Sequence, residues 1–414
     1  MKHIYTSIDI GTDTTKVIVT ELYKGKLNLL AASSIKSKGI KKGLVTNVDE
    51  AAETLKKAIN EVEQMLGFRI KKAILNIPSY FVEFAKIEGK IKIETEDSVI
   101  NGHHITSVLE NALSNAEFSK EIVSVTPIDF SVDDQTGIKD PKGLIGNTLG
   151  IRAVVSLVPK KNIYSVINLA DSIGLEVADI SLNDIGDINA FRNKEIDSSL
   201  GAIINIGYET TNISIYNKGI IIKNNILCMG GKNVDNDISY MYKLSLDEAS
   251  EIKEKFALAH KNKANINEFY ESKDNRINQL EVTEVVMSRI EEILSLSKKE
   301  INLLANRKMD YIIITGGLSN MEFFDDIATD VFGKDVIIGN VNIIGIRNNK
   351  YSSCIGNIAY YINKLKLLGK DSTMVNEEDI DNLIFSRSSL NTTNESMLSK
   401  VFGDFFGDTN EEGL

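Results

Sequence analysis

Two short segments, about 195 residues apart, share one pattern of apolar and polar positions. In each, two runs rich in β-branched residues flank a turn rich in glycine and threonine, which is typical of a β-hairpin. The first hairpin joins residues 4–10 to 16–22 through Gly11-Thr12-Asp13-Thr14-Thr15, and the second joins residues 201–206 to 212–216 through Gly207-Tyr208-Glu209-Thr210-Thr211. The repetition predicts a duplicated domain in which one turn from each half faces a shared cleft.

Helical and strand patterns alternate through the rest of the chain. Helical spacing of apolar residues predicts helices over residues 49–66, 105–116, 160–173, 245–259 and 283–304, with Asp49 as the first N-cap and Gly67 as its stop. Strand patterns occupy residues 73–77, 81–93, 151–158 and 311–315. The alternation predicts an α/β fold, and 414 residues suffice for two or more compact domains.

The chemistry of the first turn points to phosphate. A turn with glycine and hydroxyl side chains directs several backbone N–H groups into one concavity, which suits phosphate oxygens. Asp9 ends the preceding strand and would face a nucleotide-bound magnesium ion through water. Lys16 is a further charge partner unless strand alternation turns it outward. The alternative is a threonine-rich hairpin with a structural role alone.

A third feature follows the apolar strand at residues 311–315. It is the pair Gly316-Gly317 before Leu318, and paired glycines let the backbone approach a flat ligand closely. Two phosphate-type hairpins followed by this pair are stronger evidence for a nucleotide than any one of them.

In this order, the three motifs resemble phosphate 1, phosphate 2 and adenosine of the superfamily of actin, sugar kinases and seventy-kilodalton heat-shock chaperones. Other stretches are similar to the FtsA family of bacterial cell-division proteins, and the resemblance runs from about residue 5 to residue 367, plus a terminal helix. These stretches are residues 77–78, 100–102, 125–133, 137–143 and 229–238.

The resemblance implies a two-lobed actin-like fold with duplicated RNase H-like cores that close on ATP and Mg²⁺. It assigns residues 1–82, 164–190 and 350–370 to subdomain 1A, 83–163 to an inserted subdomain 1C, 191–230 and 300–349 to subdomain 2A, and 231–299 to subdomain 2B. Residues 371–394 are expected to form a flexible linker, and residues 395–407 an amphipathic membrane-targeting helix on it.

The resemblance also implies the nucleotide-binding residues. In the first lobe they are Asp9 (on the metal through water), Gly11, Thr12, Thr14, Thr15 and Lys16; in the second they are Asn205, Gly207, Thr210 and Thr211. The residues expected to bind adenosine are Gly316, Gly317 and Leu318, and Lys253 is a further candidate for contact with the ribose and base.

Three positions depart from the family pattern. Asn205 stands where the family usually has an aspartate, the second turn carries the bulky Tyr208 and the anionic Glu209, and Ser250 stands where relatives commonly place a glutamate. An amide holds a metal-bound water less strongly than a carboxylate, because charge-assisted hydrogen bonds are roughly twice as strong. No residue is an obvious general base. We therefore expect nucleotide binding with slow or absent hydrolysis and name no catalytic residue.

The chain becomes polar and acidic from residue 371. Residues 371–414 hold ten acidic and two basic residues, a net charge of −8 out of −11 for the whole chain. The remainder is near −3, which argues against nucleic acid as a partner. Near the end, apolar residues at helical spacing form a stripe of Met397, Leu398, Val401, Phe402, Phe405 and Phe406.

A stripe of this kind packs on a core, fits a partner's groove or enters a membrane surface. The polar linker before it favours an external target, and the family resemblance favours the membrane. The polar face is poor in cations, since Lys400 is its basic residue, so apolar insertion would dominate. Burying one such side chain is worth about 1.5–3 kcal/mol, and ordering the helix offsets much of that. One tail would bind weakly, whereas a filament of many tails would bind firmly.

By the same resemblance, the partners are the C-terminal tail of FtsZ at subdomain 2B, later division proteins at subdomain 1C, and other copies of the chain in filaments. The expected location is the cytoplasmic face of the cell membrane at the division site. No apolar run reaches the roughly 20 residues of a membrane span, and the N-terminus runs directly into a strand without a signal peptide.

Two further expectations concern the cysteines and a competing function. Cys228 and Cys354 lack metal-ligand spacing and are expected to be buried thiols. The alternative function is that of a small-molecule kinase of the same superfamily. Such a kinase would need a catalytic carboxylate near the γ-phosphate, and Asn205 weakens that interpretation.

Overall fold

Strands whose central members are buried along nearly their whole length build two five-stranded sheets. The computed structural model describes residues 3–271, 276–341, 343, 345–346 and 348–375. The first sheet contains β1 (His3–Ile10), β2 (Thr14–Tyr23), β3 (Lys26–Lys36), β6 (Lys72–Ile77) and β11 (Glu176–Leu182). The second contains β12 (Leu200–Ile206), β13 (Thr211–Asn217), β14 (Ile220–Leu227), β17 (Tyr311–Thr315) and β18 (Val336–Ile338).

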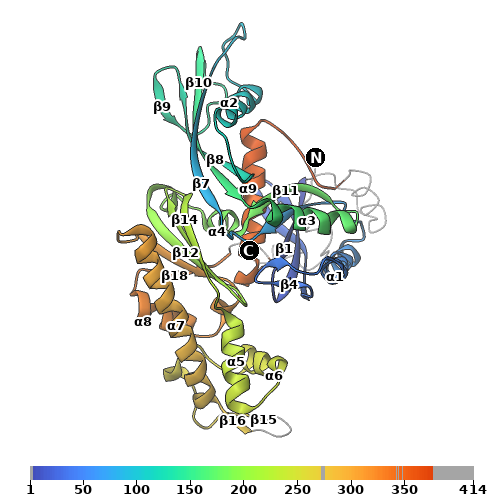
Figure 1. The fold of residues 1–414 in the computed structure, drawn as a ribbon, viewed down its shortest axis with the longest axis vertical. Coiled ribbons are helices and arrows are strands. Elements are labelled where there is room, and N and C mark those ends of the chain that lie inside the picture. Colours follow the sequence, from blue (N-terminus) through green and yellow to red (C-terminus); the bar gives the residue numbers. More distant parts are fainter. Residues whose placement is uncertain (1–2, 272–275, 342, 344, 347, 376–414) are drawn as a thin grey trace, which may run out of the picture.

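The two sheets have the same topology. Their strand orders are β11-β6-β1-β2-β3 and β18-β17-β12-β13-β14, so corresponding strands occupy corresponding places. In each sheet the first three strands are antiparallel, and the next two join them in parallel. The duplication predicted from the two hairpins is confirmed, and each sheet is the centre of one lobe (Figure 1).

Helices cover the outer face of each sheet. Helices α1 (Val48–Leu66) and α3 (Lys160–Ser172) cover the first sheet, and α7 (Gln279–Ala305) and α8 (Phe324–Phe332) cover the second. Helix α1 begins after Asn47, whose side chain accepts hydrogen bonds from two backbone N–H groups, so Asn47 rather than Asp49 is the N-cap. It ends at Gly67, as predicted, because φ is +79° there and glycine adopts that conformation without strain.

Helices α4 (Asn183–Phe191) and α9 (Ser352–Leu367) lie between the lobes (Figure 1). Helix α9 packs on the inner face of the first sheet, and α4 packs on the inner face of the second. The two helices cross at a pair of glycines, where a Cβ atom added to Gly356 would overlap the carbonyl oxygen of Gly186. The lobes are therefore joined through direct backbone contact.

Helix α4 also carries a carboxyl group into this interface. Asp184 is fully buried and accepts a hydrogen bond from the Asn212 side chain, while the Tyr216 hydroxyl donates to the Asp184 backbone carbonyl at 2.7 Å. Burial, followed by the negative charge of Asp187, raises the pKa of Asp184 to about 7. A proton on this carboxyl therefore stabilises the folded state.

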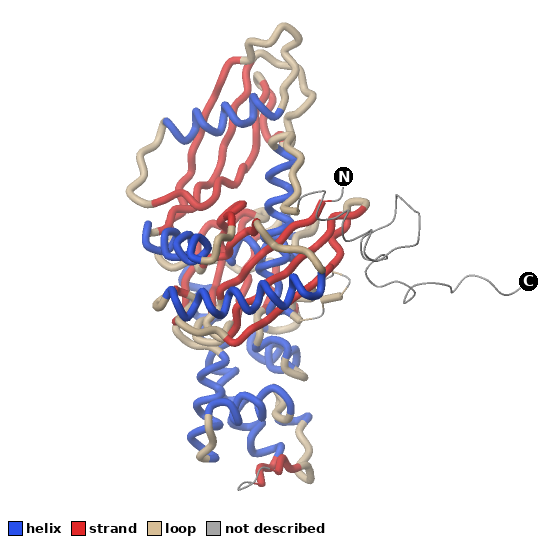
Figure 2. Tube along the Cα trace, turned by 90° about the vertical axis from the view of Figure 1, so that its right-hand side faces the viewer, coloured by secondary structure: helices blue, strands red, loops and turns tan. Residues whose placement is uncertain are grey.

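An insert domain (residues 83–158) extends from the first lobe at one end of the molecule, and Figure 2 shows a single helix lying across its sheet. It contains β7 (Glu83–Lys92), α2 (Gly102–Ser114), β8 (Glu121–Val132), β9 (Gln135–Ile138) and β10 (Thr148–Val158), with strand order β7-β10-β8-β9. Its core also receives Leu367 and Leu368, from the end of α9 and the residue after it. Helix α9 thus contacts both the lobe interface and the insert domain.

The opposite end of the molecule is helical (Figure 1). It contains α5 (Gly231–Tyr242), α6 (Leu246–Lys255), part of α7 and a small hairpin of β15 (Phe269–Glu271) and β16 (Arg276–Asn278). A second small hairpin, β4 (Ile40–Lys41) and β5 (Leu44–Val45), lies in the first lobe. No helix in the described part of the chain is long and apolar enough to cross a membrane.

Two expectations differ from the structure. Met374 and Val375 are buried, and the Met374 N–H donates to the Ile4 carbonyl oxygen at 2.9 Å, so the folded body extends at least to Val375 and the linker cannot begin at residue 371. Cys354 is buried as expected, but Cys228 is exposed, because β14 ends one residue earlier and the chain leaves the sheet there.

We expect Gly356→Ala to destabilise the protein by at least about 2 kcal/mol, because the added methyl group collides with the backbone of α4. Urea denaturation followed by circular dichroism measures the loss. Asn363→Ala is the matched control, since Asn363 lies exposed on the same helix. Equal midpoints for the two variants would contradict the close crossing.

A second expected outcome concerns pH. Folding raises the pKa of Asp184 from an ordinary value near 4 to about 7, so the folded state binds this proton more tightly than the unfolded state. Stability from this group is therefore greatest at low pH and is lost as pH rises towards about 7. Asp184→Asn cannot titrate, so its free energy of unfolding relative to wild type should increase from about pH 5.5 to about pH 8. The exposed Asp171→Asn is the control, and a flat difference for Asp184→Asn would contradict the assignment.

Candidate functional site

A cavity of about 580 Å³ lies between the lobes, where the two repeated turns meet. It is lined by twelve of the fourteen residues that the sequence predicts to bind nucleotide. These are Asp9, Gly11, Thr12, Thr14, Lys16, Asn205, Gly207, Thr210, Lys253, Gly316, Gly317 and Leu318. The six apolar residues predicted to enter a membrane lie outside the described residues.

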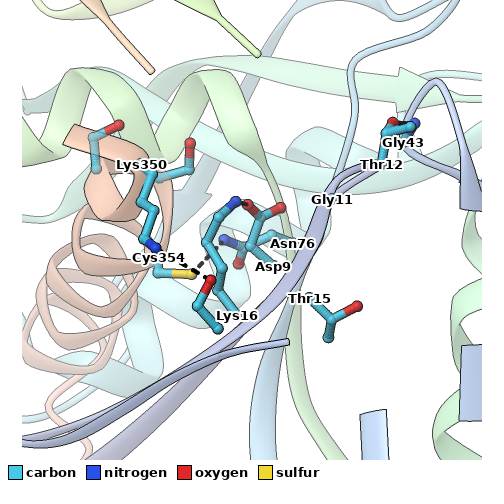
Figure 3. A network of polar contacts seen from close by, with 12 residues as sticks. Asp9, Gly11, Thr12, Thr15, Lys16, Gly43, Asn76, Lys350 and Cys354 are labelled. Atoms are coloured by element: carbon cyan, nitrogen blue, oxygen red, sulfur yellow. Dashed lines mark hydrogen bonds and ion pairs between the residues drawn. The ribbon is translucent and has the colours of Figure 1, made fainter. Parts of the chain in front are cut away.

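Asp9 and Lys16 form an ion pair at the floor of the cavity (Figure 3). They are opposite each other in the antiparallel β1–β2 register, so both side chains lie on the same face, and Lys16 Nζ is 2.7 Å from Asp9 Oδ2. Strand alternation therefore turns Lys16 towards the site and not outward. Burial alone lowers the pKa of Lys16, but the Asp9 carboxylate outweighs it and raises that pKa.

Side-chain and backbone hydrogen bonds hold the first turn in place. The Gly43 N–H donates to Thr12 Oγ1 at 2.7 Å, and Ser37 Oγ donates to the Gly11 carbonyl oxygen at 2.7 Å. Thr15 is 1% exposed, and its hydroxyl lies 3.0 Å from that of Ser37. Thr15 therefore supports the turn from behind and does not line the cavity.

The second turn is tied to both lobes through its anionic residue. Glu209 accepts a hydrogen bond from Lys232 Nζ at 2.7 Å in its own lobe and from the Lys42 backbone N–H at 2.8 Å in the other lobe. The extra anion is therefore neutralised and also links the lobes across the cavity mouth. Thr211, the last residue of the turn, is buried and donates to the Met229 carbonyl oxygen at 2.9 Å, away from the cavity.

The bulky Tyr208 of the same turn lies between two lysines. Lys36 Nζ of the first lobe is 5.6 Å from the ring centroid, and Lys253 Nζ of the second lobe is 5.7 Å from it, which is cation–π range. Lys253 is itself held by Asp235 at 2.7 Å, with both side chains buried. Burial, followed by the charge of Asp235, raises the pKa of Tyr208, so the phenol stays protonated as a donor.

The far end of the cavity is formed by the glycine pair after β17. Gly316 has φ of +98°, and a Cβ there would overlap the Ile206 carbonyl oxygen, so glycine is required. A Cβ on Gly317 would meet open space, which leaves its backbone accessible to a flat ligand. Glu254 also lines the cavity, four residues after Ser250 on α6. Glu254 thus supplies a carboxylate one helical turn after the position where the family pattern places a glutamate. The four-residue spacing from Ser250 was the sequence signal that could have identified Glu254 as a cavity residue.

Asn205 is bonded to a carboxyl group on the neighbouring helix. Its Nδ2 atom donates to Asp187 Oδ2 at 2.7 Å, and the hydroxyls of Ser352 and Ser353 each donate to Asp187 Oδ1 at 2.8 Å. Burial raises the pKa of Asp187 to about 6, although these three donors oppose the rise and the charge of Asp9 adds to it. The carboxyl group that partners β12 therefore lies beneath the cavity, on α4, and does not line it.

Lys350 is a cavity residue that sequence reasoning missed. It lies just before α9, and its ammonium group donates to Ser34 Oγ of β3 at 3.2 Å (Figure 3). Burial, followed by the positive charge of Lys16, lowers the pKa of Lys350. A lysine between two elements carries no motif, so the sequence held no signal for it.

The donor set does not fit a magnesium ion held by protein ligands. No group of three or more His, Cys, Asp or Glu able to hold a metal occurs within the described residues. Of the carboxylates that line the cavity, Asp9 is paired with Lys16, and Asp13 is paired with Lys36 at 2.9 Å. The site is equipped to hold phosphate through backbone N–H groups and lysines.

Two family models match the chain. "Cell division protein FtsA" matches residues 202–356, and "SHS2 domain inserted in FTSA" matches residues 82–156, which is the insert domain. Among curated proteins, cell division protein FtsA of Bacillus subtilis (strain 168) is 28% identical over 395 residues, covering 93% of this chain and 90% of the relative. That of Streptococcus pneumoniae serotype 2 is 28% identical over 361 residues, covering 85% and 78%.

Solved structures share the fold at low identity. The PilM-PilN type IV pilus biogenesis complex matches with a TM-score of 0.58 and 14% identity, covering 86% of this chain and 98% of that one. MreB5 of Spiroplasma citri bound to ADP matches with a TM-score of 0.53 and 13% identity, covering 89% and 99%. These likenesses establish an actin-like fold. The family models and the relatives that align over most of the chain show that it belongs to the family of cell division protein FtsA.

Proposed function

We propose that the cavity binds ATP and that the chain is an actin-like cell-division protein which polymerises and anchors FtsZ filaments to the inner face of the cytoplasmic membrane. The observation that carries nucleotide binding is the convergence of both repeated turns and the glycine pair on one cavity between the lobes. Support for the cellular role is membership of the FtsA family. MreB5 of Spiroplasma citri, which shares the fold, was solved with ADP and with AMPPNP.

The proposed arrangement places the phosphates at the two turns and the adenosine at the glycine pair. Gly11, Thr12 and Thr14 take the phosphates from the first lobe, and Gly207 and Thr210 take them from the second. Gly316, Gly317, Lys253 and Glu254 surround the adenosine. Magnesium that accompanies the nucleotide would be carried by phosphate oxygens and water beside Asp9.

The proposed division of labour outside the cavity follows the family. The helical end around 231–299 binds the C-terminal tail of FtsZ, and the insert domain receives later division proteins. The apolar residues from Met397 to Phe406 insert into lipid, at the cytoplasmic face of the membrane at the division site. In a filament, many tails that each bind lipid weakly together give firm attachment. ATP sets the closure of the lobes that filament formation requires.

We expect ATP hydrolysis to be slow, with turnover below about 1 s⁻¹, because the end of β12 presents an amide to the cavity and the carboxyl group lies beneath it on Asp187. Exchanging the two groups tests this. Asn205→Asp alone places a second carboxyl group next to that of Asp187 and removes the hydrogen-bond donor between them, which should lower the free energy of unfolding by about 1–3 kcal/mol. Adding Asp187→Asn restores the hydrogen bond, recovers most of that stability, and should raise turnover at least about tenfold.

Urea denaturation and phosphate release, measured on the wild type, both single variants and the double variant, give the complete cycle. A wild-type turnover well above about 1 s⁻¹ would contradict slow hydrolysis. A folded double variant with unchanged turnover would show that the amide at the end of β12 does not limit hydrolysis.

Co-sedimentation of FtsZ filaments with liposomes, in the presence of ATP, tests the tether. The full chain should carry FtsZ to the lipid pellet, and a chain that ends at Asn394 should leave it in the supernatant. Phe402→Asp with Phe405→Asp in the full chain should behave like the truncation, because charged groups resist apolar insertion. Ser399→Ala, on the expected polar face, is the matched control. If truncation leaves lipid binding intact, the membrane assignment is wrong.

A further inference from the structure

The cavity contains more positive than negative side chains. Its acidic lining residues are Asp9, Asp13 and Glu254, and its basic lining residues are Lys16, Lys42, Lys253 and Lys350. Lys16 and Lys253 are paired with carboxylates, whereas Lys42 and Lys350 donate hydrogen bonds to neutral groups. Lys16 is held by Asp9, Lys253 is held by Asp235, and Lys42 Nζ donates to Cys228 Sγ at 3.3 Å.

Lys350 differs from the two paired lysines because it lacks a carboxylate partner, and it differs from the exposed Lys42 because it is half-buried. No carboxylate lies within 4.0 Å of its ammonium group in the part of the chain that the structure describes. Its hydrogen bond goes to the neutral hydroxyl of Ser34, and its ammonium group lies 5.1 Å from the centroid of the neutral Tyr351 ring. The carboxylates of Glu254 and Asp13 act on it from farther away. The group is thus a half-buried cation whose charge is incompletely balanced by the protein.

The second ammonium group near the floor of the cavity belongs to Lys16. A Cβ atom on Gly11 would lie 3.4 Å from Lys16 Nζ, so this ammonium sits directly beneath the first phosphate-type turn. An ammonium has three donors, and one hydrogen bond to Asp9 leaves others for a ligand. Lys16 and Lys350 repel each other across this region, and that repulsion is part of what lowers the pKa of Lys350. An anion placed near both would relieve it.

The carboxyl groups in the same region are already engaged by other protein groups. Asp187 is 1% exposed, with both oxygens engaged by Asn205, Ser352 and Ser353, so it cannot offer an oxygen to a cation in the cavity. Asp9 is partly neutralised by Lys16. A divalent ion entering beside the phosphates would therefore meet two ammonium groups and the carboxylates of Asp9 and Asp13, each already paired with a lysine, which is an unfavourable environment for it.

We propose that Lys16 and Lys350 together neutralise the phosphates of the bound nucleotide, so that this site binds ATP without needing a divalent cation. Lys350 is thereby a phosphate-binding residue, reaching the ligand from the junction before α9. The inference rests on the proposed function, since it concerns the same cavity. To the proposed ATP site it adds two points. Lys350 is a source of positive charge for the phosphates, and binding does not require magnesium.

The test is the affinity of the full chain for ATP, measured by isothermal titration calorimetry in magnesium and again in EDTA. For the wild type we expect the two dissociation constants to agree within about threefold. Lys350→Ala should weaken ATP binding in EDTA by at least about tenfold, as expected for the loss of one charge-assisted contact. Lys350→Arg should retain most of the affinity. Adenosine, which has no phosphate, should bind the alanine variant and the wild type equally.

Lys364→Ala is the matched control, because Lys364 lies on α9 but pairs with Asp179 far from the cavity. Wild-type ATP binding that disappears in EDTA would overturn the inference while leaving nucleotide binding intact. An unchanged affinity of Lys350→Ala in EDTA would also overturn it. Absence of ATP binding in both buffers would instead overturn the proposed function itself. The wild-type comparison decides the independence from magnesium even if a variant fails to fold, and Lys350→Arg provides a second, conservative variant for the role of Lys350.

Discussion

The backbone contact between α4 and α9 is the constraint on which the rest of the structure depends. Gly186 and Gly356 bring the two helices so close that no side chain fits between them. Each helix is packed on the inner face of a different sheet, so the crossing fixes the separation of the lobes. It also places Ser352 and Ser353 against Asp187, beneath the cavity that both hairpins line. Close packing at one point thus determines whether two distant turns can share one ligand.

The sequence predicted the parts of the fold that local patterns encode. Both hairpins, the glycine pair after β17 and the long helices α1 and α7 have strong periodicity or turn chemistry, and the structure contains them. Helices α4 and α9 were not predicted, because elements buried on several sides have no polar face to set a period. The same limit applies to the site. Motif position could not separate Thr12, which lines the cavity, from Thr15 and Thr211, which are buried behind it.

The departures from the family pattern become intelligible only in three dimensions. Glu209 is neutralised by Lys232 and by a backbone N–H of the other lobe, and the Tyr208 ring lies between two lysines. Glu254 supplies a carboxylate one turn after Ser250. Each substitution is matched by a partner that is distant in sequence or a helical turn away.

Helix α9 connects the cavity to the insert domain. Ser353 near its start lines the cavity, and Leu367 and Leu368 at its end belong to the core of the insert domain. The insert domain is further attached where the Lys142 ammonium donates to the Lys366 carbonyl oxygen. The helix is continuous from Ser352 to Leu367. The insert domain and the contact between the lobes are therefore connected through a single continuous helix.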